Sequence, residues 1–307
     1  MNVIFMGTPQ IACDVLTELV NLDNINLLGV ICQPDRELDR KKNIIFSPVK
    51  QFCINNNIKT YQPEKISSLY DELSSLKIDL FITCAYGQFI PDKIINLARI
   101  GAFNLHASLL PLLRGGAPIH WAIINGFNET GITLMRMIKK MDAGAIIKQK
   151  SCLISPNETT STLTKKLSLL TCEILKENWS LLSNPDEIKK VEIEQNEIDA
   201  TFGLNITKED MKINFYKNAH EIDCLVRGLY DKPIARWNYK DIEIKVFSIE
   251  LTNIKSKLNP GQITKFDKTG LFVSTNDFDI KITSLQLPGK KITNPIHLLN
   301  GNNPFNS

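Results

Sequence analysis

The stretch that decides how this chain folds is Ile100-Gly101-Ala102-Phe103-Asn104-Leu105-His106-Ala107-Ser108-Leu109-Leu110-Pro111. Its first half, residues 100–105, is short and apolar, as in a buried strand, and a loop with Pro111, Gly115 and Gly116 follows. In an open α/β sheet, ligands bind outside the carboxyl ends of the strands. The stretch therefore predicts a strand that delivers polar side chains to a site at its end.

Three polar residues in and after this stretch suit transfer of an acyl group to an amine. Asn104 and His106 lie at the end of the strand, and Asp142 follows in Met141-Asp142-Ala143-Gly144. An amide can donate to a developing oxyanion, an imidazole can carry a proton, and a carboxylate can tune the imidazole or accept from the nucleophile. The structural alternative is that Asn104 and His106 satisfy backbone groups and that Asp142 belongs to an ordinary turn.

The first half of the chain alternates short apolar runs with amphipathic stretches. We predict buried strands at residues 3–6, 27–32, 80–84 and 102–105, and helices near 11–22, 48–55, 67–76 and 118–125. Ser47-Pro48 is a helix start signal, with Ser as the N-cap and Pro at the first helical position. This alternation predicts a parallel sheet with right-handed crossovers, a Rossmann-like layout.

The second half changes character. Strands are expected at residues 133–138 and 145–154, and a closing helix at 158–182. Residues 184–205 carry six acidic residues and two lysines, which suits an exposed connection. Beyond it we expect a helix at 218–229 and strands at 242–249, 261–266, 271–275 and 280–285. Several short strands in about 100 residues indicate a small open barrel.

Composition limits the function classes. A chain of 307 residues with 43% hydrophobic and 22% charged residues fits a two-domain soluble protein. It has no apolar run of about 18 residues and no signal-peptide pattern at its start, so we expect a cytoplasmic protein that does not bind membranes. Seven scattered cysteines and four histidines show no metal-ligand spacing, which predicts free thiols and no metal. A net charge of +3 permits a polyanionic partner without implying one.

The motifs carry a resemblance that extends over nearly the whole chain. Asn104-x-His106-x-Ser108-Leu109-Leu110-Pro111, Arg114-Gly115 and Asp142-x-Gly144 resemble the signature of the folate-dependent formyltransferases. Further segments are similar to those of methionyl-tRNA formyltransferases: residues 4–9, 33–36, 47–50, 85–87, 260–263 and 285–291. The resemblance implies an α/β fold, with a Rossmann-like formyltransferase domain at 1–184, a linker at 185–205 and an OB-like β-barrel tRNA-binding domain at 206–307.

The resemblance also implies the substrates and the roles of the site residues. The donor is 10-formyltetrahydrofolate, and the acceptor is the α-amino group of methionyl initiator tRNA. Asn104 and protonated His106 stabilise the formyl oxygen, while Asp142 holds His106 in the useful protonation state and assists proton loss from the amine. The loop that contacts the folate consists of Ser108, Leu109, Leu110 and Pro111. We expect a monomer, although the sequence itself does not fix the oligomeric state.

A basic loop at residues 33–47 matches the loop that meets the tRNA acceptor stem in the family. Its cations are Arg36, Arg40, Lys41 and Lys42. It departs from the family pattern because Glu37-Leu38-Asp39 replaces the usual Pro-Ala-Gly, which leaves open whether Arg40 or Lys41 contacts the tRNA. The structural alternative is a solvated surface loop.

Three rival functions stay open. A folate-dependent formyltransferase acting on an amino-sugar nucleotide or a purine precursor would share the first domain. A non-catalytic RNA-binding protein would keep the fold without the chemistry. An NAD-dependent oxidoreductase is disfavoured, because Met6-Gly7-Thr8-Pro9 lacks the Gly-x-Gly-x-x-Gly pattern after the first strand.

Overall fold

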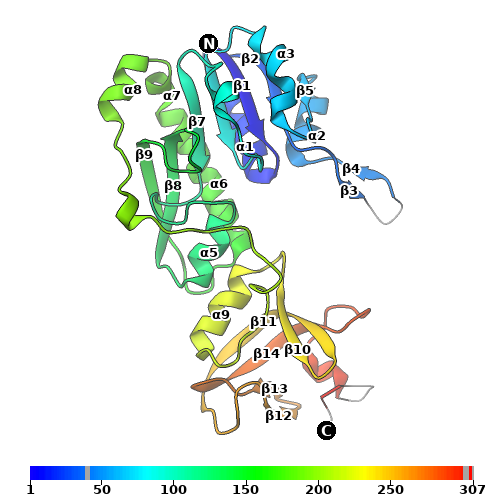
Figure 1. Ribbon diagram of the computed structural model, residues 1–307. Coiled ribbons are helices and arrows are strands. Elements are labelled where there is room, and N and C mark those ends of the chain that lie inside the picture. Colours follow the sequence, from blue (N-terminus) through cyan, green and yellow to red (C-terminus); the bar gives the residue numbers. More distant parts are fainter. Residues whose placement is uncertain (39–41, 300–303, 306–307) are drawn as a thin grey trace. The chain divides into compact units, whose positions relative to one another are not determined.

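The strands expected in the first half of the chain lie in one seven-stranded sheet in the computed structural model, which describes residues 1–38, 42–299 and 304–305 (Figure 1). The strands are β1 Asn2–Gly7, β2 Asn26–Ile31, β5 Thr60–Tyr61, β6 Leu80–Cys84, β7 Gly101–His106, β8 Glu129–Arg136 and β9 Ile146–Leu153. Their order is β5-β2-β1-β6-β7-β8-β9, parallel from β5 to β7, with β8 and β9 antiparallel. The predicted Rossmann-like layout is confirmed.

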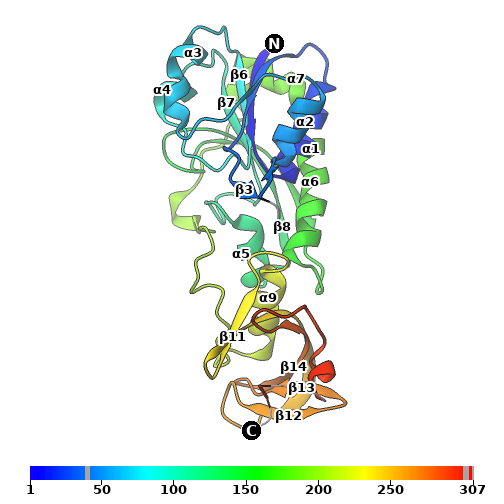
Figure 2. The same ribbon diagram turned by 90° about the vertical axis from the view of Figure 1, so that its right-hand side faces the viewer.

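Burial explains why these runs form central strands. All residues of β6 and the last five of β1 are buried, as in parallel strands covered on both faces. The covering helices are α1 Gln10–Val20, α2 Pro48–Asn55, η1 Ile66–Leu69, α3 Tyr70–Ser74, α4 Asp92–Ile95, α6 Thr160–Glu177 and α7 Trp179–Leu182. Figure 2 shows α3 and α4 on one face of the sheet and α1, α2, α6 and α7 on the other.

Local sequence signals predict an element correctly where a capping residue is present, and they miss very short elements. Ser47 accepts a hydrogen bond from the Lys50 backbone at 3.2 Å and Pro48 opens α2, as predicted. The helix expected at 158–182 is interrupted after α6, where the Asn178 side chain donates to the Ile174 carbonyl at 2.7 Å. The elements β5 and α4 were not foreseen, because two to four residues carry almost no periodic signal.

The chain divides into two compact units that do not follow a single cut in the sequence. The first comprises Met1–Pro118, Glu129–Leu153 and Thr164–Leu204. The second comprises Ile119–Asn128, Ile154–Leu163 and the chain from Asn205 onward. Most of the short helix α5, Pro118–Ile124, therefore belongs with the C-terminal part of the chain.

The second unit is built on a curved antiparallel sheet of five strands. In spatial order they are β10 Ala235–Tyr239, β11 Ile242–Lys255, β14 Phe278–Gln286, β13 Gly270–Val273 and β12 Ile263–Asp267. Helix α9, Ala219–Gly228, packs on it through Ile222 and Val226, around a core that includes Trp237. A short 3₁₀ helix, η3, follows at Pro295–Leu298. The expected α/β fold with a β-rich C-terminal domain is confirmed, although β10 was missed.

The segment expected as an exposed connection is largely exposed, yet it is not loose. It contains α8, Pro185–Val191, and η2, Glu197–Asp199. Residues 192–203, called the strap below, form hydrogen bonds to the rest of the first unit along most of their length. This difference from the prediction matters for the site.

Candidate active site

Strand β7 places Asn104 and His106 two residues apart, so that both side chains leave the same face of the sheet near its carboxyl end. The neighbouring strand fixes the amide, because the Thr83 hydroxyl donates to Asn104 Oδ1 at 2.7 Å. Among the described residues, the hydrogen bonds of the Asn104 side chain involve Oδ1 and not Nδ2. The amide nitrogen is thus a donor held in orientation and left available.

His106 is buried, and one of its ring nitrogens is committed. Its Nε2 lies 3.0 Å from the Leu113 carbonyl, which can only accept, so Nε2 carries a hydrogen. The other nitrogen, Nδ1, lies 3.7 Å from Asp142 Oδ2. That distance is too long for a hydrogen bond, and the two groups form an ion pair only when the imidazole is protonated. The structure therefore brings together the imidazole and the carboxylate that the sequence separates by 36 positions.

Asp142 is held in a tight turn between β8 and β9. Its φ of 51° lies in the left-handed region, which Asp tolerates better than most residues. The Gly115 backbone donates to Asp142 Oδ2 at 2.9 Å. Two residues on, a Cβ at Gly144 would lie 2.0 Å from the Arg136 carbonyl oxygen, which explains why the turn needs glycine there.

Thr133 on β8 holds the loop after β7 in place through hydrogen bonds. The Thr133 hydroxyl donates to the Ser108 carbonyl at 2.6 Å and accepts from the Leu110 backbone at 3.1 Å. Gln149 on β9 adds a hydrogen bond to the Leu110 carbonyl at 2.8 Å. Ser108 and Leu110 are buried within the loop, while Leu109 and Pro111 are half-buried. Of the four residues expected to contact folate, Leu109 and Pro111 are therefore the more exposed.

The strap supplies residues that the sequence analysis missed. The Arg114 guanidinium is fully buried and donates to Gln195 Oε1 and to the Glu197 carboxylate at 2.8–3.1 Å. The Thr201 hydroxyl accepts from the Leu113 backbone at 2.9 Å. Hydrogen bonds from Lys140 and Arg114 hold the pKa of Glu197 below its ordinary value. The only signal in the sequence was Arg114 itself, because a buried arginine requires acidic or amide partners.

The structure describes part of the basic loop at residues 33–47. Arg36 pairs with Glu64 at 2.6 Å, but both side chains are largely exposed, so the pair adds little stability. Lys42 is exposed with a φ of 65°. Arg40 and Lys41 lie outside the described residues. Around them the expected loop includes a short antiparallel hairpin of β3, Glu37–Leu38, and β4, Ile44–Ile45.

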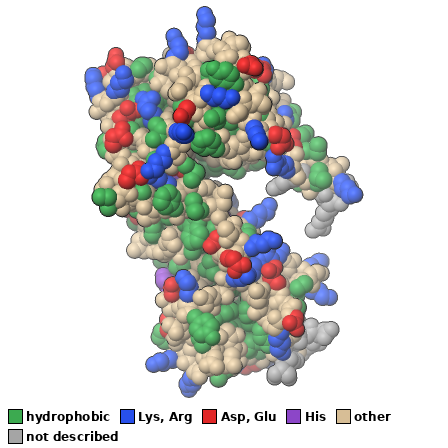
Figure 3. Space-filling view, in the orientation of Figure 1, with side chains coloured by type: hydrophobic (Ala, Val, Ile, Leu, Met, Phe, Trp, Pro, Cys, Tyr) green, Lys and Arg blue, Asp and Glu red, His purple; other side chains and the backbone are tan. Residues whose placement is uncertain are grey.

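In the second unit, the lysines on or beside β11 and β14 include Lys245, Lys281, Lys290 and Lys291. Lys281 pairs with Glu250 at 2.9 Å, whereas Lys290 and Lys291 are exposed in the segment after β14. Figure 3 shows lysines and arginines spread over the visible face and interspersed with acidic groups. Basic charge in this unit is therefore distributed and not gathered in one continuous patch on this face.

Two features of residues 1–38, 42–299 and 304–305 bear on function. They contain no group of three His, Cys, Asp or Glu side chains placed to hold a metal ion. Across the same ranges, every helix is too short or too polar to cross a bilayer.

Comparison with known proteins identifies the family of the chain. Residues 1–178 match the family model described as formyl transferase, and residues 205–303 match the formyl transferase C-terminal domain. The chain belongs to the formyl transferase family. A curated relative named methionyl-tRNA formyltransferase, from Ureaplasma urealyticum serovar 10, is 49% identical over 306 residues, covering 100% of this chain and 99% of the relative. One of the same name from Staphylococcus aureus strain MW2 is 40% identical over 94% of this chain and 93% of its own.

Solved structures with the same fold are more distant in sequence. WlaRD, described as a sugar 3N-formyl transferase, has a TM-score of 0.65 at 23% identity, covering 95% of this chain and 99% of its own. An N-formyltransferase from Helicobacter canadensis has a TM-score of 0.67 at 22% identity, covering 91% and 98%. At these identities the likeness establishes the fold of the family and does not separate one acceptor from another.

Proposed function

We propose that this chain transfers a formyl group from 10-formyltetrahydrofolate to the α-amino group of methionyl initiator tRNA. The observation that carries the proposal is 49% identity over the whole chain to a methionyl-tRNA formyltransferase, with Asn104, His106 and Asp142 all present. Within the proposal, residues 1–184 form the catalytic domain, 185–205 the linker and 206–307 the tRNA-binding domain. The protein acts as a monomer in the cytoplasm.

The chemistry requires stabilisation of a negative oxygen and movement of protons. The amine nitrogen forms a bond to the formyl carbon, and the bond from that carbon to N10 of the folate breaks. The amine loses one proton and N10 gains one. Asn104 Nδ2 is the oriented donor for the formyl oxygen, and a donor of this kind contributes about 3–4 kcal/mol. The amide N–H of Asn104 is thus the donor that this residue offers to the formyl oxygen.

His106 and Asp142 handle the proton. Because Nε2 is held by the Leu113 carbonyl, Nδ1 is the nitrogen available for proton transfer. A proton bound at Nδ1 would face the Asp142 carboxylate, whose Oδ2 lies 3.7 Å away. His106 is buried and Asp142 is half-buried, so solvent screens an electrostatic interaction between them less than it would at the surface.

The rest of the site supports binding. The loop of Ser108, Leu109, Leu110 and Pro111 offers backbone groups and half-buried apolar surface to the folate. The residues proposed to meet the acceptor stem are Arg36, Arg40, Lys41 and Lys42. The exposed hairpin that precedes α2 places the described members of this set on the surface.

One assay separates this proposal from its rivals. The purified protein is incubated with labelled formyl donor and, in parallel, with methionylated initiator tRNA, methionylated elongator tRNA or a dTDP-linked amino sugar. We expect label on initiator tRNA only. Label on the amino sugar alone supports the sugar-nucleotide alternative. Label on none of them, beside an active control enzyme, leaves the non-catalytic RNA-binding alternative and overturns the proposal.

A further inference from the structure

Gln195 contacts two segments of the site, the loop after β7 through Arg114 and the turn that carries Asp142. Its Oε1 accepts from Arg114 Nε at 3.0 Å and from Nη2 at 2.8 Å. Its Nε2 donates to the carbonyl of Asp142 at 2.9 Å and to that of Gly144 at 2.7 Å. One half-buried amide in the strap therefore joins the loop after β7 to the turn before β9.

The chemistry of the bridge needs an amide. Arg114 supplies only donors, and the turn offers only carbonyl acceptors to the strap at this point. A glutamate could satisfy Arg114 but would present oxygen to the two carbonyls. A lysine or arginine could satisfy the carbonyls but would repel Arg114. Glutamine accepts at one atom and donates at the other, so it fits both sides at once.

The bridge bears on the distance that matters for proton transfer. Asp142 sits in a left-handed turn, and its carboxylate reaches His106 Nδ1 at 3.7 Å without a direct hydrogen bond. Small movements of such a pair change its interaction strongly in a buried site. The Asp142 side chain is itself held by the Gly115 backbone, next to Arg114. Gln195 thus fixes the turn to the same loop that orients the carboxylate.

We propose that Gln195 is a positioning residue that sets the placement of Asp142 relative to His106. It acts through the backbone carbonyls of the turn and touches no reacting atom. The inference rests on the proposed function for its kinetic consequence but not for its geometry. The neighbouring strap contacts, such as Ile193 with Ile146 and Glu192 with Arg136, secure the strap without reaching Asp142.

The first test compares Gln195→Glu with Asn196→Asp. The first variant keeps the acceptor for Arg114 and removes both donors to the turn. The second makes the same amide-to-acid change at the adjacent, exposed residue; it keeps the oxygen that caps η2 and loses the exposed hydrogen bond from Asn196 Nδ2 to Asp199 Oδ2 at 2.8 Å. We expect Q195E to lower kcat by roughly 10- to 100-fold, with KM for both substrates within about threefold and a melting temperature lowered by about a few degrees through the two lost hydrogen bonds. N196D should match the wild type.

A double-mutant cycle shows whether Gln195 acts through Asp142. If it does, Q195E should change kcat by less than about twofold when Asp142 is already asparagine, because the group it positions has been removed. Equal effects of Q195E in both backgrounds would mean a general structural role and would overturn the inference. So would a Q195E enzyme that turns over like N196D.

A measurement without catalysis separates this inference from the proposed function. The chain has four histidines, so the ring ¹⁵N resonances of His106 can be assigned by comparison with a His106→Gln variant. They should shift in Q195E and stay unchanged in N196D. A chain that formylates no tRNA would refute the proposed function, while the NMR comparison would still decide the geometry. Unshifted His106 resonances in Q195E would refute the positioning role.

Discussion

At the scale of single residues, hydrogen bonds with neighbouring residues restrict the orientation of each proposed catalytic side chain. Thr83 orients the Asn104 amide, the Leu113 carbonyl fixes the His106 ring, and Gly115 anchors the Asp142 carboxylate. Each of these contacts leaves one polar atom available for a substrate. Catalysis by oriented donors depends on such restriction, because no reorganisation is then needed when charge develops.

The first prediction concerns Asp142. Asp142→Asn preserves size and can still accept from Gly115, but it removes the negative charge beside His106. We expect kcat to fall by about 10²–10⁴, the usual worth of acid–base assistance, while KM for tRNA stays within a few-fold. Steady-state kinetics and a tRNA binding assay would check it. Parallel loss of turnover and tRNA affinity would instead mark Asp142 as a binding residue.

The second prediction concerns Thr83, which the family signature does not include. Thr83→Val keeps the shape of the side chain and removes the donor to Asn104 Oδ1. One neutral hydrogen bond is worth about 0.5–1.5 kcal/mol, so kcat should fall roughly 2- to 10-fold as the amide loses its fixed orientation. Thr171→Val is the matched control, because it removes a buried hydroxyl that donates to the Leu167 carbonyl within α6. Equal turnover in the two variants would contradict the role of Thr83.

At the scale of elements, short polar contacts between distant segments decide how helices and turns begin. Helix α9 starts with a capping box of Asn218 and Glu221, which the sequence pattern alone can suggest. A second carboxylate also contacts the start of this helix, since Asp277 Oδ1 accepts a hydrogen bond from the Ala219 backbone at 2.8 Å. This last contact spans 58 residues and follows only from the packing of α9 on the sheet.

The third prediction follows from the charge on Asp277. Burial alone would raise the pKa of this carboxyl, but hydrogen bonds from the Ala219 and Phe278 backbones and the Thr275 hydroxyl outweigh it and lower the pKa below 3.8. A folded-state pKa below the unfolded one gives stability that is present above about pH 4 and is lost as the pH falls through the folded value. Asp277→Asn should therefore lose less stability between pH 5 and pH 2 than the wild type, measured by urea unfolding. Parallel pH curves for the two proteins would exclude this contribution.

At the scale of the whole molecule, charge is the property that suits a polyanionic partner. From Asn205 onward the chain has 15 Lys and Arg against 11 Asp and Glu, a surplus of four in a chain whose total is +3. The second unit is thus more basic than the rest. Such a surplus acts mainly on association rate and salt dependence and much less on folding.

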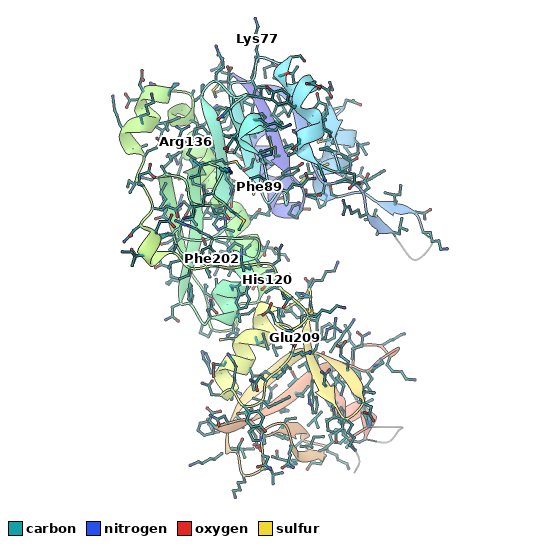
Figure 4. All side chains as sticks on the ribbon, viewed as in Figure 1. Lys77, Phe89, His120, Arg136, Phe202 and Glu209 are labelled. Atoms are coloured by element: carbon teal, nitrogen blue, oxygen red, sulfur yellow. The ribbon has the colours of Figure 1, made fainter. Side chains whose placement is uncertain are left out.

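The fourth prediction tests this surplus. Lys290→Gln with Lys291→Gln should weaken tRNA binding and reduce the slope of log Kd against log salt by about 1 for each lysine that meets a phosphate. Lys77→Gln is the control, since this exposed lysine lies in the first unit just before β6 (Figure 4). Binding measured at several salt concentrations would decide it. An unchanged slope in the double variant would place the phosphate contacts elsewhere.

The features of this protein that depend on local sequence pattern could be predicted from the sequence. Continuous apolar runs predicted β1 and β6 because a strand buried on both faces has no polar side, and Ser47-Pro48 predicted the start of α2 because capping is a contact over three residues. The side-chain types of Asn104, His106 and Asp142 indicated acyl transfer, because an amide, an imidazole and a carboxylate have the same chemical abilities in any fold. These inferences needed no knowledge of the path of the chain.

Only the tertiary structure decided how those groups are placed. Folding brings together partners that are distant in the sequence. It decides which nitrogen of His106 faces Asp142 and which hydroxyl orients Asn104. It also places the strap so that it joins Arg114 to the Asp142 turn. The bond from Arg114 to Gln195 spans 81 residues, and an acidic, non-periodic segment gives no local sign of such a partner. The physical reason is that a hydrogen bond depends on positions within a few tenths of an ångström, which the packing of distant segments sets and local sequence does not.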